Sequence, residues 1–396
     1  MNELSAFKGK VSAVRGSTNV EHIANEDRLL ALVSAWERLA EAAAEPNKLM
    51  QPAMALPAWR HLEGGRHIDW LFVWRGEKDK GKEQLIGVFA LASRPPSPRL
   101  PFRHTETWRH ELGYLGTPLV HARHLDEAVS AVLEWLTARK IRLLRLRQMS
   151  AEGPVRSAFV AALNAKCMPF DVYNAHVRAC LKSDVSGDDY LQASLGGKRL
   201  KEYRRLAKRL GEEGALSFEV LGAEQEVMAA AEEFLALERG GWKGRAGTAI
   251  AQDEAALAFF REAVAKLAGT GGLRIVRLAL DGKAVAVGIL LAAGETAWLW
   301  KIAHDEAHAR HSPGVLLAIE LTRHLLDEGT YAIVDSCAAP DHPMIDHVWR
   351  ERLAITDTLA VLRPGLVPAA AIFACARAAS ALAAAIKRLL RRLGRR

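Results

Sequence analysis

Apolar residues divide Leu273–Glu328 into three strand-like runs followed by one helix-like run. The strand-like runs cover Leu273–Leu280, Val285–Ala292 and Thr296–Ala303, and Gly-containing turns separate them. A short polar loop then leads to Gly314–Glu328, where apolar residues recur at helical spacing. A strand that delivers a Ser/Gly loop to a helix N-terminus builds an anion site, because free backbone N–H groups and the helix dipole converge there. This segment therefore predicts a site for the pyrophosphate of a coenzyme.

The remaining apolar patterns predict the same order of elements in both halves of the chain. Helix, antiparallel strands, helix, strand, helix and strand follow one another twice, which predicts an α/β fold with a mixed sheet. The order of elements repeats although the residues do not, and this favours a tandem duplication. In the first half the predicted helices are Asp27–Ala44, His124–Arg139 and Pro154–Ala165, and the predicted strands are Trp70–Trp74, Gln84–Ala92, Leu112–Val120, Ile141–Gln148 and a closing pair in Phe170–Lys182. The second half adds helices at Ala223–Glu238, Gln252–Ala268 and Pro343–Leu353 and strands at Tyr331–Cys337 and Thr356–Leu362.

Length and composition agree with this organisation. A chain of 396 residues suits two domains, and we predict domains at 1–182 and 183–364 with a C-terminal helix at 365–396. The hydrophobic share of 50% and the charged share of 25% are typical of a soluble globular protein. The four cysteines are scattered without a CxxC pair, which favours reduced thiols in a cytoplasm and no metal site. The polar segment Met1–Glu26 does not resemble a secretory signal.

The net charge of +8 belongs largely to the C-terminal tail. The last twenty residues hold seven Lys or Arg and no acidic residue, so the rest of the chain is nearly neutral. Val367–Ile386 has the length of a membrane span, but it is rich in Ala and interrupted by Arg377. Apolar residues share one helical face of the tail, namely Leu382, Ile386, Leu389, Leu390 and Leu393. The tail therefore predicts either an amphipathic helix on an anionic membrane surface or a helix docked on the protein body.

A second basic segment lies between the halves. Gly196–Gly211 carries seven Lys/Arg on one helix-like stretch. One interpretation is a surface for an anionic substrate or nucleic acid. The other is a solvated helix face, because Leu200, Tyr203, Leu206 and Leu210 supply an apolar stripe at helical spacing.

Several motifs of the second half occur together in one known family. They are GKRLKEYRRLAKRLGEEG at 197–214, GGWKGRAGTA at Gly240–Ala249, WLWKIAHDE at Trp298–Glu306, SPGVLL at Ser312–Leu317 and VDSCAAPDHPMIDHVWRERL at Val334–Leu353. Over Tyr190–Pro364 the chain resembles the GNAT acyltransferase fold, and within it the CelD-like group named after bacterial cellulose biosynthesis, relatives of the FemAB-type transferases. The resemblance implies tandem GNAT-like domains, each a mixed, mostly antiparallel twisted sheet flanked by helices. The first half looks like a degenerate copy.

The resemblance implies transfer of an acyl group from acetyl-CoA or another acyl-CoA to an amine, with no metal. It places the pyrophosphate on Arg310, His311, Ser312, Gly314 and Val315. The usual GNAT loop has Gln or Arg, two residues, Gly, one residue, and then Gly or Ala. With Gly314 in the last position, Ser312 takes the place of the first Gly, and Arg310 lies one residue out of register. A backbone N–H on Thr296–Ala303 is the expected donor to the thioester oxyanion.

Candidate acids and bases follow the next strand, where the cleft is expected to open. Asp335 ends that strand, and Asp341 and His342 follow on the loop. We predict that Asp341 and His342 act as base, or that His342 protonates the leaving thiolate. The alternative roles are a loop cap for Asp335 and capping or packing for His342 and His347. Cys337 is not expected to be a nucleophile, because direct transfer needs none.

Four residues are predicted to bind the acceptor. Trp242 and Lys243 lie in a Gly-rich loop that is able to close over a substrate; the alternative for Trp242 is a plug in the domain interface. Lys301 and His304 lie on the strand beside the phosphate loop. Lys301 is expected to pair with a phosphate or an acidic acceptor, or else with Asp305 or Glu306.

Three functions remain open from the sequence. The first is an N-acyltransferase for a small-molecule or glycan amine such as an amino sugar or polysaccharide precursor, located in the cytoplasm or at the inner face of the membrane. The second is a FemAB-like transferase that takes its donor from aminoacyl-tRNA, which the basic segment favours; otherwise nucleic acid is not expected to bind. The third is a non-catalytic scaffold that the tail recruits to a membrane.

Overall fold

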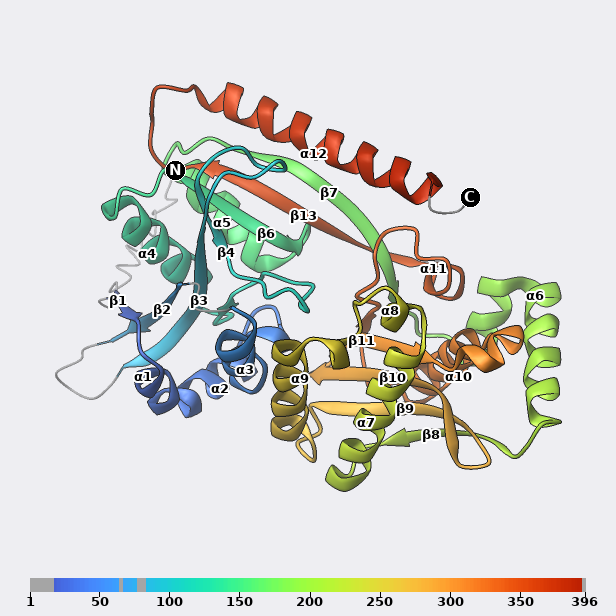
Figure 1. Cartoon of the computed structure of the whole chain (residues 1–396). Helices are drawn as coiled ribbons and strands as arrows, with labels where there is room; N and C mark the ends of the chain where they lie inside the picture. Colours follow the sequence, from blue (N-terminus) through green and yellow to red (C-terminus); the bar gives the residue numbers. More distant parts are fainter. Residues whose placement is uncertain (1–17, 64–66, 77–82, 394–396) are drawn as a thin grey trace, which may run out of the picture.

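The strands of the protein form one continuous sheet (Figure 1). The computed structural model describes residues 18–63, 67–76 and 83–393. The sheet order is β1-β2-β3-β4-β6-β13-β7-β12-β11-β10-β9-β8, and β5 pairs with β3 beside this path. The strands are β1 (Thr18–Ile23), β2 (Ile68–Arg75), β3 (Gln84–Arg94), β4 (His104–Thr107), β5 (Leu119–Val120), β6 (Leu143–Ser150), β7 (Phe170–Leu181), β8 (Leu216–Leu221), β9 (Leu273–Leu280), β10 (Lys283–Ala293), β11 (Thr296–His304), β12 (Ile333–Asp335) and β13 (Glu351–Val361).

Helices cover both faces of the sheet. The α-helices are α1 (Glu26–Ala31), α2 (Val33–Glu41), α3 (Pro52–Leu62), α4 (Leu125–Ala138), α5 (Pro154–Ala165), α6 (Gly187–Gly211), α7 (Glu224–Gly240), α8 (Trp242–Arg245), α9 (Glu254–Leu267), α10 (Pro313–Glu328), α11 (Ile345–Val348) and α12 (Ala369–Leu393). Short 3-10 helices are η1 (Lys48–Met50), η3 (Ile250–Gln252) and η4 (Glu306–His311). This mixed, largely antiparallel sheet flanked by helices confirms the predicted α/β fold class.

The two halves of the chain, residues 1–182 and 183–364, exchange strands at the centre of the sheet. β13 of the second half lies between β6 and β7 of the first half, and β7 lies between β13 and β12. β7 and β13 pair antiparallel along their length, from Phe170 opposite Ala360 to Cys180 opposite Glu351. Backbone hydrogen bonds of the sheet therefore run without interruption from one half to the other.

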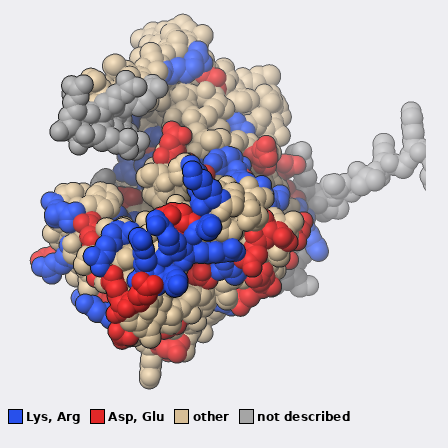
Figure 2. All heavy atoms as spheres, turned by 90° about the vertical axis from the view of Figure 1, so that its right-hand side faces the viewer, with Lys and Arg blue, Asp and Glu red and all other residues tan. Residues whose placement is uncertain are grey.

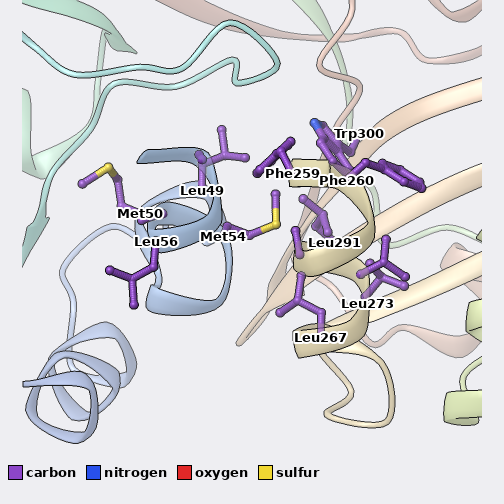
Figure 3. Close-up of a cluster of buried hydrophobic side chains, with 14 of the residues drawn as sticks. Leu49, Met50, Met54, Leu56, Phe259, Phe260, Leu267, Leu273, Leu291 and Trp300 are labelled. Carbon is purple, nitrogen blue, oxygen red and sulfur yellow. The ribbon is translucent and has the colours of Figure 1, made fainter. Parts of the chain in front are cut away.

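A shared hydrophobic core also joins the halves. α3 of the first half packs against α9 of the second, and their side chains interdigitate in Figure 3. Leu49 and Met54 face Phe259 across this contact, and all three are almost fully buried. At about 25 cal/mol per Å² of apolar surface removed from water, aromatic and Leu/Met side chains of this kind each contribute about 1.5–3 kcal/mol. Separation of the halves would expose this surface to water.

Several predicted elements differ from the observed ones. Leu112–Val120 is not one strand, because only β5 at its end pairs, and β4 supplies the missing strand. Pro343–Leu353 is not a helix: α11 has four residues, and β13 already begins at Glu351. Phe170–Lys182 forms a single long strand rather than a pair. Asp27–Ala44 is broken at Leu32 into α1 and α2.

The tail forms the long helix α12, which lies along the β7–β13 side of the molecule (Figure 1). Its first part docks through Ile372, Phe373 and Ala376, which pack in a small core with Leu359. Its later part exposes Leu382 and other apolar residues to solvent. Ala369–Ile386 is long and apolar enough to cross a membrane by length and composition, with 17% of this window buried in the protein. Docking and an exposed apolar face are thus both present in one helix.

Candidate functional site

β11 and β12 part after a short parallel pairing, and this opening organises the predicted site residues. The pairing covers Thr296 opposite Ile333 to Trp298 opposite Asp335. Two residues further on, β11 has a β-bulge at Trp300, which has no residue opposite it on β10. A bulge interrupts the ladder and changes the direction of nearby side chains and N–H groups. The predicted oxyanion strand therefore carries an irregularity at the point where it leaves its neighbour.

Lys301 follows the bulge, and its ammonium is buried inside the opening. Burial, and next the charge of Lys243, lower the pKa of Lys301 to about 8. Glu238 lies near, but its carboxylate already accepts from Lys243 Nζ at 2.6 Å and from the Ile250 N–H at 2.8 Å. Within the described ranges no ion pair holds Lys301. Its ammonium lies 5.8 Å from the centroid of the Trp300 ring. A buried ammonium without a carboxylate partner is costly, so this position favours an anionic ligand.

The alternative predicted for Lys301, an ion pair with Asp305 or Glu306, does not occur. Glu306 accepts from the Trp242 N–H at 2.6 Å and pairs with Arg245 at 2.7 Å. Asp305 caps η4 by accepting from the Ala307 N–H at 2.9 Å. Neither carboxylate therefore neutralises Lys301.

A loop of the first half lies against this opening, and no pattern in the sequence indicates it. The Trp300 indole donates to the Leu112 carbonyl at 2.9 Å, and Arg178 donates to the Tyr114 carbonyl at 3.2 Å. Both ring nitrogens of His110 are buried without a hydrogen-bond partner, and the buried Tyr114 hydroxyl lies against the Cys337 thiol. Burial, followed by the charges of Arg109 and Lys301, lowers the pKa of His110 to about 3, so its ring is neutral. The first half therefore supplies polar groups beside Lys301.

Asp335 is committed to structural contacts on the other side of the opening. It is 2% exposed, one carboxylate oxygen pairs with Arg178, and the other accepts from the Cys337 N–H at 2.9 Å. Burial and then the Asp335 charge raise the pKa of the Cys337 thiol well above its usual range. The thiolate is the nucleophilic form of cysteine, so this environment disfavours a nucleophilic Cys337.

His342 caps the short helix α11. Its Nδ1 accepts from the N–H groups of Met344 at 3.3 Å and Ile345 at 3.4 Å, so the ring proton lies on Nε2. Burial lowers the pKa of His342, Asp346 opposes this shift, and Lys243 adds to it. A neutral ring with a free Nε2–H is a hydrogen-bond donor and not a base. Asp341 is exposed, and its φ of 57° places it in the left-handed region of the same loop.

The predicted phosphate loop joins η4 directly to α10. Ser312 has a φ of 52° and makes no side-chain cap, and its carbonyl accepts from the Val315 N–H at 2.9 Å. Gly314 is buried, and a Cβ there would lie 3.3 Å from His304 Nδ1 and 3.5 Å from Met344 Sδ. Its N–H has no hydrogen-bond partner among the described residues. The first turn of α10 contains no acid, so the helix dipole there is uncompensated.

The basic residues of this loop are held by one carboxylate from the end of α6. Glu213 binds Arg310 at 2.6 Å, His311 Nε2 at 2.8 Å and His308 Nδ1 at 3.3 Å. The hydrogen bonds from Arg310 and His311 lower the pKa of Glu213. An anion at the α10 N-terminus would compete with Glu213 for these cations.

The Gly-rich loop predicted to cover the substrate borders the same opening. Trp242 is 59% exposed on α8, so it does not plug a domain interface. A small cavity of about 30 Å³ lies between Trp242, Lys243 and Ala303, with His304 at its edge. The charge of Lys243 lowers the pKa of both Lys301 and His342, so Lys243 lies near each of these two predicted residues.

The basic segment forms the exposed side of α6. Figure 2 shows a cluster of Lys and Arg side chains on this side of the molecule. Gly196 has a φ of 70° and separates two helical pieces, and all seven Lys/Arg of Gly196–Gly211 are exposed. Of these seven, Arg205 forms the one ion pair found within the described chain, with Glu202. The apolar residues Leu200 and Leu210 are buried, so the segment combines a solvated basic face with a packed face.

One group of side chains among the described residues has the spacing to hold a metal ion. His22, His67 and Asp69 place their ligand atoms within 4.8 Å of one another. They lie at the β1–β2 edge of the sheet, where both histidines bond the Asp69 carboxylate. This group is separate from the opening between β11 and β12, and the site there contains no such cluster among the described residues.

Comparison with known proteins agrees with this geometry. Residues 197–342 match the family model of the acetyltransferase (GNAT) domain. Over these residues the second half is therefore similar to GNAT acetyltransferase domains. The match spans α6 to the loop before α11, including β11, the phosphate loop and Lys301. It supports an N-acyltransferase activity.

Solved structures share the fold over most of the chain. A conserved protein of unknown function from Bacteroides thetaiotaomicron has 13% identity and a TM-score of 0.53, and the alignment covers 87% of this chain and 100% of that one. FemX has 11% identity and a TM-score of 0.50, with 86% and 96% covered. The C-terminal domain of a protein assigned as a lysylphosphatidylglycerol synthetase from Agrobacterium fabrum has 14% identity and a TM-score of 0.50, with 88% and 95% covered. No curated protein matches the chain.

Proposed function

We propose that the protein is an N-acyltransferase that moves an acyl group, acetyl in the simplest case, from acyl-CoA to the amine of a small molecule or glycan. The observation that carries the proposal is the free Gly314 N–H at an acid-free helix start, beside the opening between β11 and β12. Phosphate oxygens bind helix N-termini of this kind. The His304 ring lies beside Gly314. Arg310 and His311, which precede this helix start, form ion pairs with Glu213.

The reaction requires the amine nitrogen to attack the thioester carbonyl carbon. The C–N bond forms while the C–S bond breaks, the amine loses one proton, and the thiolate gains one. In this proposal a backbone N–H at the interrupted ladder around Trp300 donates to the carbonyl oxygen as it becomes negative; the register shift there supports this role. Such a fixed donor typically contributes 10²–10³-fold in rate.

The two ammonium groups of Lys301 and Lys243 favour a neutral amine in the site. Nearby cations lower the pKa of an amine, so the acceptor enters without the proton that would block attack. Lys301 is then free to pair with a carboxylate or phosphate of the acceptor, as the sequence predicted. In this proposal Asp335 and His342 position the loop, and the proton acceptor is not one of these two residues.

The CelD-like resemblance adds a substrate class. It favours an amino sugar or another polysaccharide precursor as acceptor. The exposed Trp242 beside Lys243 supports this choice, because an aromatic ring at the mouth of a site stacks on a sugar ring.

A thermal-shift experiment tests the donor site. Acetyl-CoA at about 100 times its dissociation constant stabilises a protein by about 2.7 kcal/mol, which raises the unfolding midpoint by several degrees. Gly314→Asp places a carboxylate at the phosphate position and should abolish this shift. Gly314→Ala adds bulk without charge and should keep it. The proposal fails if no acyl-CoA, from acetyl to long-chain, stabilises the wild-type protein.

A second candidate function is a transferase that takes its donor from aminoacyl-tRNA. The exposed basic face of α6 supports it (Figure 2), and the fold shared with FemX is compatible with it. tRNA binding should then weaken steeply with salt, because phosphate contacts release counterions. Exchanging Arg204, Arg205, Lys208 and Arg209 for Gln should remove it. A matched variant that removes four exposed charges of the first half, Arg99, Arg103, Arg123 and Lys140, should keep it.

A membrane surface is the partner proposed for α12. Its exposed Leu382, Ile386 and Leu389 precede a basic tail, a pattern typical of helices on anionic lipid. The full chain should sediment with vesicles that contain phosphatidylglycerol and not with pure phosphatidylcholine, and a chain ending at Arg377 should sediment with neither. If the truncated chain still binds, α12 is a docking helix only. A non-catalytic scaffold would bind vesicles in the same way but bind no acyl-CoA.

A further inference from the structure

A large groove lies between the halves at the end of the sheet opposite Lys301. It has a volume of about 900 Å³ and is lined by residues of both halves. Thr296 and Tyr331 place it at the beginning of β11 and just before β12, whereas the opening described above lies past the β11–β12 pairing. Its volume is within the range of small-molecule sites. The groove is therefore a separate place from the proposed acyl-transfer site.

Lys48 is the unusual residue of this groove. It is 7% exposed, it lines the groove, and its ammonium lies against the backbone of Gly272. Its neighbours Leu49 and Met50 are in the shared core, as Figure 3 shows. Asn47 fixes the turn by accepting from the Leu49 N–H at 3.2 Å and donating to the Thr117 carbonyl at 2.8 Å. The position of Lys48 is therefore set by packed structure.

No carboxylate neutralises Lys48 in the described part of the chain. The other cations of the groove have partners: Lys266 with Glu262 at 3.8 Å, and Arg274 with Glu328 at 3.7 Å. Burial lowers the pKa of Lys48 to about 8, so it is still mostly protonated at neutral pH. Burying an ammonium without a partner costs free energy, which a bound anion would recover.

The rim of the groove has the opposite charge. Glu37, Glu41 and Glu295 line it, are exposed, and have no ion pair among the described residues. A phosphate dianion would be repelled by these carboxylates, whereas a single carboxylate with a nearby cation would match both charges. We propose that the groove binds a small zwitterion of the amino-acid class, with its carboxylate on Lys48 and its ammonium facing the rim glutamates.

Thermal unfolding with defined probes tests this site. Each of the twenty free amino acids, acetate and inorganic phosphate is added at matched ionic strength to the full chain. At least one amino acid should raise the unfolding midpoint by several degrees, and acetate and phosphate should do so less. Lys48→Met should abolish this shift. Lys266→Met, which removes a groove lysine that already has a partner, should keep it.

A second measurement separates binding from folding. Lys48→Met removes a buried charge, so the variant without ligand should be at least as stable as the wild type, and its failure to respond would then reflect lost binding. In protein with ¹³C-methylated lysines, the Lys48 resonance should titrate near pH 8 and shift upward in pKa with the amino acid. The inference is overturned if no amino acid stabilises the protein, if Lys48→Met still responds, or if phosphate stabilises equally well. Acetyl-CoA binding should be unaffected in every case, so failure of this site is distinguishable from failure of the acyltransferase proposal.

Discussion

β4 parts from β6 in the first half of the chain much as β11 parts from β12 in the second. Both pairs are parallel, and both lie at the same place in the order of strands of their half. In the first half the opening is filled by the chain itself. The Gly116 N–H donates to the Gln148 carbonyl at 3.2 Å, and Thr107 Oγ1 accepts from the Arg147 N–H at 2.9 Å. In the second half no segment of that half bonds between the two strands within the described ranges. Instead, the first-half loop beside the opening bonds Trp300 through the Leu112 carbonyl and Arg178 through the Tyr114 carbonyl.

The helices α4 and α10 differ in the charge of their first turns. α4 begins with Asp126 and Glu127, whose charges already oppose its N-terminal dipole. α10 begins with Pro313 and Gly314 and has no acid in its first turn. Buried charge also differs: Glu106 in the first half binds three arginines, whereas Lys301 in the second has no ion pair among the described residues. The first opening is thus closed by hydrogen bonds of its own half, and its buried charge is neutralised. The second is not closed in this way, and its buried lysine lacks a carboxylate partner that an anionic ligand could supply.

The strongest test of this contrast removes Glu106. Its carboxylate is 2% exposed and binds Arg94, Arg145 and Arg147. Glu106→Ala removes the carboxylate that these buried arginines share, although Arg145 keeps Asp357 at 2.9 Å, and should lower the free energy of unfolding by about 3–5 kcal/mol. Urea unfolding measures this loss. Acetyl-CoA binding by the folded fraction should be unchanged, and the exposed pair Glu232–Arg261 provides a control, since Glu232→Ala should cost less than about 1 kcal/mol.

The pH dependence of the same group gives an independent check. Burial alone would raise the pKa of Glu106, but the His104 ring, whose Nε2 lies 3.6 Å from the carboxylate, and the charges of Arg147 and Arg145 hold it far below its usual range. Its stabilisation is therefore complete above the pKa of the unfolded chain, about 4.3, and is lost as the pH falls below that value. The wild type should lose more stability than Glu106→Ala between pH 5 and pH 2. Equal acid sensitivity of the two proteins would contradict the buried network.

The next test adds one methyl group to each opening. A Cβ at position 116 would collide with the Arg147 carbonyl oxygen and lie 3.1 Å from Thr107 Oγ1, so Gly116→Ala should cost roughly 2–3 kcal/mol in unfolding free energy. A Cβ at position 314 would meet a His304 ring atom at 3.3 Å and Met344 at 3.5 Å, side chains that can move, so Gly314→Ala should cost less than about 1 kcal/mol. Comparable losses would show that the second opening is as tightly filled as the first.

Much of this arrangement follows from local sequence. Leu273–Leu280 and Pro154–Ala165 are predicted with their observed bounds, because alternation and helix-start signals were strong there. Lys243, Lys301 and His342 were each singled out, and the structure places Lys243 near the other two. The residues around Glu351 were assigned to a helix because their apolar spacing fits one. Pairing with β7 overrides that local preference and makes Glu351–Leu353 part of a strand.

Local sequence patterns do not predict contacts between segments that are distant in the chain. The strand exchange of β7 and β13 depends on the partner surface of the other half. Tyr114 lies in the segment predicted as a strand and His110 just before it, and nothing local indicates that His110 lies near Lys301 or Tyr114 near Cys337. Lys48 stands in a short turn whose burial comes from α9 and β10, elements more than two hundred residues away in the chain.

Substitution of Lys301 tests whether its buried ammonium in the second opening binds an anionic ligand. Lys301→Met should raise the KM for an anionic acceptor about 10- to 30-fold, which corresponds to about 1.4–2 kcal/mol of binding free energy. In the wild type KM should rise above pH 8, where the ammonium is lost, and this rise should be absent from the variant. Because folding depresses the pKa of Lys301 below the usual 10.5, burial of its charge destabilises the wild type below that pH. The variant should therefore be at least as stable at pH 7.

The smallest effect is expected at His342, although the sequence placed it among the catalytic residues. Its Nδ1 serves the Met344 and Ile345 N–H groups, so His342→Ala removes a helix cap worth about 0.5–1 kcal/mol of unfolding free energy. The rate constant kcat should fall less than tenfold, and its pH profile should keep its shape, because a neutral ring with a proton on Nε2 exchanges no proton near neutral pH. His342→Asn retains a capping oxygen and should restore the stability. The opposite result would be a loss of 100-fold or more in kcat, together with loss of one limb of the pH profile and no rescue by Asn. His342 would then be a catalytic proton-transfer group in the second opening, which the first opening lacks.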